Sequence, residues 1–150
     1  MGSQTPSDRI VPYYAYTDGP DAVKVLAVGK LIVDPWQSEV LNDWMGRTED
    51  DVWSAPTCGL SVPRQNGKTL DTSGRIASGM ILYAEWVIYT AHLQKTATET
   101  FMELRGLFES RGLRKYVKEI KAALGREQIK KWWKSSICCQ NQEWRSRTAR

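Results

Sequence analysis

The sequence predicts an α/β fold, in which crossover helices connect the strands of a parallel sheet that this chain supplies only in part. Three observations predict it. Residues 58–62 form a short apolar run bounded by turn residues, and residues 68–83 follow with apolar positions at helical spacing. Residues 86–90 then form a run of bulky aromatic and β-branched residues. The order of strand, loop, helix and strand is that of a βαβ unit, and a further helix is predicted after it.

The first 29 residues predict an irregular N-terminal arm. The stretch is polar at its start and is interrupted by Pro6, Pro12 and Pro20. β-branched residues between Val23 and Val33 predict a short strand at the end of this arm. The main folded part of the chain is expected to follow.

A helix is predicted to open at Asp34-Pro35, because aspartate suits the N-cap and proline suits the first helical position. Its buried face is predicted from residues at helical spacing, which are Trp36, Val40, Leu41 and Trp44. Gly46 fits its end.

Two more helices are predicted after the strand at residues 86–90. The first spans about residues 96–110 and carries its apolar face on Ala97, Phe101, Leu104 and Phe108. The second spans about residues 113–124 and ends at Gly125.

The segment 62–69 reads Val-Pro-Arg-Gln-Asn-Gly-Lys-Thr and lies between a predicted strand and a predicted helix. In that setting, loop amides and the positive end of the helix bind phosphate. Gly67 would let the backbone approach the ligand, Lys68 would neutralise the β- and γ-phosphates, and Thr69 would place its hydroxyl on Mg²⁺. The general pattern asks for glycine where Val62 stands, so a surface turn with a solvated Lys68 is the alternative.

These residues resemble the deviant phosphate loop of the large terminase subunit, the DNA-packaging ATPase of tailed phages. That family replaces the first glycine and carries an Arg-Gln pair before Gly-Lys, as Arg64 and Gln65 do here. Asp34-Pro35-Trp36-Gln37 resembles the family's upstream adenine-recognition motif. Residues 86–92 and 94–97 resemble its second strand and the polar stretch after it. The resemblance covers roughly residues 30–129, with its motifs in the family's order, and implies a partial P-loop NTPase-type sheet.

The resemblance implies ATP and Mg²⁺ as cofactors. The residues that would hold them are Gln37, Gln65, Asn66, Gly67, Lys68 and Thr69, with the Thr69 hydroxyl on the metal. Arg64 would be the catalytic residue and would stabilise charge on the transferred phosphoryl group, the alternative being a solvated loop arginine.

The roles of Gln37, His92 and Gln94 stay open. Gln37 would bind the adenine edge, because its amide both donates and accepts. However, Asp-x-x-Gln is also a capping box with Gln37 at the N3 position. His92 and Gln94 follow a predicted strand end, where they could sense the nucleotide or serve a structural role.

The chain is expected to be incomplete as an ATPase. No apolar strand ending in an acidic pair follows Lys68, and no nuclease domain is visible. Whether it is an enzyme is therefore left open, and weak or absent hydrolysis is expected. In the intact family the partners are phage DNA, the portal protein and the small terminase subunit, and the site of action is the bacterial host cytoplasm.

Residues 130–150 are predicted to be a non-native or disordered basic tail. Apolar periodicity is lost after Ile129, and a reading-frame shift near Lys130 would explain the change. Residues 111–150 hold 12 Lys and Arg against 3 Asp and Glu, whereas residues 1–110 hold 9 against 14. This asymmetry keeps open an alternative function, that of a non-enzymatic remnant or a small basic nucleic-acid-binding protein.

Membrane and secreted classes are not expected, nor is a metal site built from cysteine or histidine. The longest apolar run, residues 77–91, is interrupted by Glu85 and is shorter than the ~20 residues that a bilayer needs. The N-terminus lacks a basic start followed by an apolar stretch, so a cytoplasmic protein is predicted. The cysteines and the single His92 form no metal-ligand pattern, and Cys58 is predicted to be a small buried residue.

Overall fold

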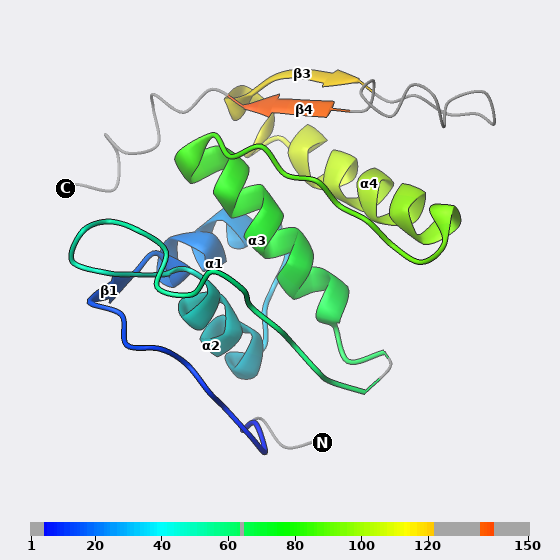
Figure 1. Cartoon of the computed structure of the whole chain (residues 1–150). Coiled ribbons are helices and arrows are strands. Elements are labelled where there is room, and N and C mark those ends of the chain that lie inside the picture. The colour runs from blue at the N-terminus through cyan, green and yellow to red at the C-terminus, as the bar shows by residue number, and fades with distance from the viewer. Residues whose placement is uncertain (1–4, 64, 122–135, 140–150) are drawn as a thin grey trace. The chain divides into compact units, whose positions relative to one another are not determined.

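The computed structural model describes residues 5–63, 65–121 and 136–139, with side chains described as far as Lys118. The chain divides into two compact units, residues 1–78 and 79–150, and the boundary falls within the long helix α3, Lys68–Tyr83. The described residues combine helices with two antiparallel sheets of two strands each (Figure 1). Mixed helix and strand content agrees with the predicted α/β class at this coarse level, but the described residues contain no parallel sheet.

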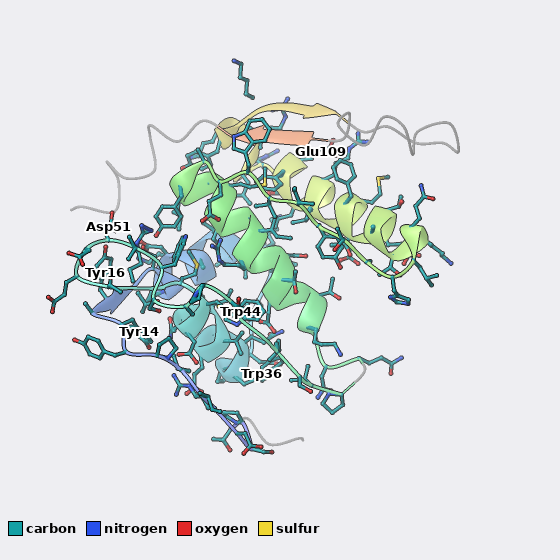
Figure 2. The ribbon with its side chains drawn as sticks, viewed as in Figure 1. Tyr14, Tyr16, Trp36, Trp44, Asp51 and Glu109 are labelled. Atoms are coloured by element: carbon teal, nitrogen blue, oxygen red, sulfur yellow. The ribbon has the colours of Figure 1, made fainter. Side chains whose placement is uncertain are left out.

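The first unit opens with β1, Tyr16–Thr17, and α1, Gly19–Val28, followed by α2, Pro35–Trp44, and β2, Gly46–Arg47. β1 pairs antiparallel with β2, with Tyr16 opposite Arg47. The Tyr16 hydroxyl donates a hydrogen bond to the Asp51 carboxylate, which fixes the loop after β2 to β1 (Figure 2).

Helix α1 corrects the prediction of an irregular arm over residues 1–29 and of a short strand between Val23 and Val33. Pro20 lies in its first turn, where a missing N–H costs nothing. Ala22, Val25 and Leu26 are fully buried on one face. Burial of a helical stripe therefore outweighs the strand preference of β-branched residues, which is a weak local bias.

Helix α2 begins and ends where the sequence predicted. Asp34 occupies the N-cap with extended backbone, and Pro35 is the first helical residue. Leu41 is fully buried, while the side chains of Trp36 and Trp44 are partly exposed near the two ends of the helix (Figure 2).

The first-unit part of α3 packs against α1 and α2 through Gly74. A Cβ atom at Gly74 would lie 2.7 Å from Leu26 Cδ1 and 3.5 Å from Leu41 Cδ2, so a glycine allows this close approach. Arg75, the next residue, stacks its guanidinium 4.7 Å from the ring centroid of Trp53, and the Arg47 guanidinium stacks 4.4 Å from the same centroid. The close approach at Gly74 holds α3 against the two preceding helices, and the Trp53 ring connects α3 with β2 through Arg75 and Arg47.

Replacing Gly19 by alanine is expected to lower the free energy of unfolding by about 2 kcal/mol. A Cβ atom at Gly19 would lie 2.4 Å from the Cα atom of Asn42, and the backbone of α2 cannot move away without disturbing its own packing. Urea unfolding of Gly19→Ala measures the loss. Gly59→Ala is the matched control, because nothing lies within 4 Å of its Cβ position. Equal stabilities for the two variants would contradict the contact.

The second unit contains α4, Gln94–Glu109, the 3₁₀ turn η1, Arg114–Tyr116, and the strands β3, Val117–Lys121, and β4, Ser136–Cys139. Helix α4 confirms the predicted helix at residues 96–110. The described buried apolar residues of the second unit come from three segments. They are Ile81 and Leu82 at the end of α3, Leu104, Leu107 and Phe108 in α4, and Leu113, Tyr116 and Val117 after α4.

The predicted helix at residues 113–124 is wrong. After η1 the chain turns into β3, which pairs antiparallel with β4, Val117 opposite Cys139. Helical spacing over so short a segment could not decide between helix and strand, and pairing with a distant segment decided it. Of the expected basic tail at residues 130–150, the structure describes only residues 136–139, which form β4.

Neither of the two segments predicted as parallel strands is a strand. Residues 58–62 and 86–90 carry no regular structure, although both lie within the described part of the chain. In the second segment, Trp86 is 98% exposed and Ile88 is 83% exposed. A strand is defined by its partner, so strand preference alone leaves such a segment unpaired. Among the described residues, no helix is long and apolar enough to cross a membrane.

Candidate functional site

The loop at residues 62–67 leads directly into α3, which begins at Lys68 as the sequence predicted. Gly67 has a φ of +78°, in the left-handed region that favours glycine. Gln65 also has a positive φ, +64°, which is uncommon for a residue with a side chain. The Leu70 N–H donates to the Gly67 carbonyl over 2.9 Å. The loop therefore ends in a tight turn that becomes the first turn of the helix.

Lys68 links the two ends of this loop. Its Nζ donates a hydrogen bond to the Val62 carbonyl over 2.9 Å, so the chain folds back on itself. The residues from Gln65 to Thr69 are exposed. An accessible ammonium group thus lies beside the N-terminus of a 16-residue helix, whose first amides have no acceptor within the helix. Both features favour a bound anion.

Gln37 joins the start of α2 to this loop. Its Oε1 accepts a hydrogen bond of 2.8 Å from the Asp34 N–H, and its Nε2 donates one of 3.2 Å to the Gly67 carbonyl. The side chain is only 3% exposed. The capping-box alternative is therefore confirmed. The adenine role stays a prediction.

The remaining predicted site residues are distributed along the chain. Thr69 is exposed in the first turn of α3, and Asn66 is exposed in the loop. Arg64, the predicted catalytic residue, lies outside the described residues. His92 and Gln94 are exposed in the second unit. His92 lies just before α4, and Gln94 is the first residue of that helix.

Asp71 is a notable residue of this region that the sequence interpretation missed. It lies in the first turn of α3 and is fully buried, and neither carboxyl oxygen has a hydrogen-bond partner among the described residues. Burial raises the pKa of the Asp71 carboxyl to about 7, and the nearby charge of Asp34 adds to the increase. Helical spacing did not mark it, because Ser78, seven residues later on the same face, is polar although it too is buried.

Two other features of the first unit offer less chemistry. A shallow hollow is lined by Trp44, Cys58 and Arg75. Cys58 is exposed, which corrects the prediction that it is buried. Within the described ranges, no three His, Cys, Asp or Glu side chains are grouped closely enough to hold a metal ion.

Comparison of the chain with protein-family models, with curated proteins and with solved structures found no match.

Proposed function

We propose that this chain is the ATP-binding, N-terminal part of a DNA-packaging ATPase of the phage large-terminase type. The observation that carries the proposal is the loop at residues 62–67. It is closed by the Lys68–Val62 hydrogen bond and turns through a left-handed Gly67 into the N-terminus of α3. An exposed loop of this shape, ending in a lysine at a helix start, suits the phosphates of a nucleotide.

The chemistry of the proposed site follows from these positions. The first-turn amides of α3 would donate to phosphate oxygens, and the Lys68 ammonium would leave the Val62 carbonyl for the more strongly attracting anion. Arg64, next to Gln65 in the sequence, would add the charge that stabilises phosphoryl transfer. Incomplete acidic machinery would keep hydrolysis weak, so ATP binding is the activity that this chain is proposed to retain.

Mg²⁺ would enter this site with the nucleotide. Thr69 offers an exposed hydroxyl one residue after Lys68, and oxygen ligands are those that Mg²⁺ prefers. When bound, the ion would neutralise phosphate charge. The parallel sheet implied by the resemblance belongs to the same proposal, with residues 58–62 and 86–90 as strands that pair in the intact protein. Their present lack of regular structure and the exposure of Trp86 and Ile88 are what that pairing would remove.

Titration of the full chain with ATP, with and without Mg²⁺, tests the proposal, and Thr69→Val tests the metal contact. Wild-type protein is expected to bind Mg·ATP more tightly than ATP alone. Thr69→Val is expected to reduce that gain about tenfold, because valine keeps the shape and removes one oxygen ligand. Isothermal titration calorimetry measures the dissociation constants of ATP and of Mg·ATP for each protein.

Thr72→Val is the matched control. The Thr72 hydroxyl donates to the Lys68 carbonyl one turn farther along the same helix, so its removal should leave the Mg²⁺ gain unchanged. Absence of ATP binding by the wild-type chain would overturn the proposed function. A normal Mg²⁺ gain in Thr69→Val would remove Thr69 from the site.

The charge asymmetry of the chain favours a second candidate, a small basic nucleic-acid-binding protein. Residues 111–150 hold 12 basic residues against 3 acidic ones. Such a segment would bind DNA with an affinity that falls steeply with salt. DNA binding that is unaffected by Lys68→Ala, and is lost when residues 130–150 are removed, would support this candidate over ATP binding.

A further inference from the structure

The Gln37 side chain connects two motifs that are 30 residues apart in the sequence. Its Oε1 accepts from the Asp34 N–H, and its Nε2 donates to the Gly67 carbonyl. Only 3% of Gln37 is exposed at that position. A buried amide whose two ends are both hydrogen-bonded holds its partners in a fixed relation.

The Gly67 carbonyl is the point on which the loop turns. It accepts a hydrogen bond from the Leu70 N–H as well as from Gln37, so two donors fix its direction. The Gly67 backbone takes the left-handed conformation immediately before Lys68. The orientation of this carbonyl therefore determines where the Lys68 N–H points, because the two groups share one peptide plane.

Gly67 and Gln37 also fit each other sterically. A Cβ atom at residue 67 would lie 2.7 Å from Gln37 Nε2, which is closer than a carbon and a nitrogen can approach. The glycine thus serves the contact with Gln37 as well as the positive φ. This contact places the end of the Gln37 side chain directly against the loop.

We infer that Gln37 is a positioning residue for phosphate binding, which holds the loop before Lys68 through the Gly67 carbonyl and does not read the base of the nucleotide. The inference rests on the proposed function and deepens it. A residue that reads adenine would change the preference for ATP over GTP. A residue that positions the loop would change the affinity for any ligand with the same phosphates, by the same factor.

The test uses the full chain with three ligands, which are ATP, GTP and inorganic tripolyphosphate. Gln37→Met keeps the side-chain length and removes both hydrogen bonds. Only one of these bonds reaches the loop, so the affinity for each of the three ligands is expected to fall about fivefold, the value of one ordinary hydrogen bond. The ratio of the ATP and GTP affinities should stay unchanged. Ser38→Ala, the next residue on α2, is the control and should bind like the wild type.

Gln37→Glu separates the two hydrogen bonds. Its carboxylate can still accept from the Asp34 N–H, as glutamate does in a capping box, but it cannot donate to the Gly67 carbonyl. Its buried carboxylate would face the Gly67 carbonyl, so this variant is expected to melt below the wild type. Its affinity for all three ligands should fall at least as far as that of Gln37→Met.

Hydrogen exchange of the Leu70 amide reports on the loop without any ligand. Leu70 donates to the carbonyl that Gln37 holds, so Gln37→Met is expected to speed its exchange about fivefold. Faster exchange together with equal losses for the three ligands supports the inference. Loss confined to ATP, or no loss in any ligand, overturns it. If the wild type binds none of the three, the proposed function falls and the positioning role falls with it, whereas the exchange result still decides whether Gln37 restrains the loop.

Discussion

Replacing Lys68 by alanine is expected to weaken ATP binding about a hundredfold, the effect of losing one charge-assisted contact to phosphate. In the ligand-free loop the Lys68 ammonium donates to the Val62 carbonyl. It is exposed and beside the amides of the first α3 turn, so it can move to a phosphate at little cost. Calorimetric titration with ATP and with tripolyphosphate should show the same loss, because the ammonium contacts phosphate alone.

Two further variants isolate the charge. Lys68→Met keeps the aliphatic stem and should lose nearly as much affinity as Lys68→Ala. Lys95→Ala removes a lysine from the first turn of another 16-residue helix, where Lys95 is the second residue of α4, and should bind ATP like the wild type. Affinity of Lys68→Ala within twofold of the wild type would contradict a phosphate contact, and the solvated-turn alternative would then stand.

Replacing Asp71 by asparagine is expected to stabilise the protein at pH 8. The carboxyl group is fully buried with no hydrogen-bond partner among the described residues, and its pKa is raised from an ordinary 3.8 to about 7. Between these values the folded state holds a proton that the unfolded state has lost. Stability is therefore fully present below about pH 4 and declines as the pH rises through about 7, by at most about 1.4 kcal/mol per pH unit.

Asparagine has a similar shape and no charge, so it removes this decline. Urea unfolding at pH 5 and pH 8 should show the wild type losing on the order of 2–4 kcal/mol, and Asp71→Asn losing clearly less. Asp50→Asn, which changes the same charge on an exposed residue, is the control and should follow the wild type. Parallel pH profiles for Asp71→Asn and the wild type would mean that Asp71 does not titrate in the core.

Some elements of this protein followed from local sequence. Asp34-Pro35 marks the start of α2, and helical spacing marks α4 to within two residues at each end. Lys68 was predicted as the start of α3 and proved to be so. These signals are local, because caps and amphipathic stripes act within one or two turns of the chain. The loop between residues 62 and 68 was likewise predicted from Pro63 and Gly67.

Pairing and burial between distant residues could not be predicted in this way. The sequence alone placed strands at residues 58–62 and 86–90 and a helix at residues 113–124, whereas the tertiary structure pairs β3 with β4 and leaves the first two segments irregular. It also decided that Gln37 contacts the Gly67 carbonyl and that Asp71 is buried with no hydrogen-bond partner in the described part of the chain. The physical reason is that a strand and a buried polar group are defined by partners, and partners are brought together only when the whole unit folds.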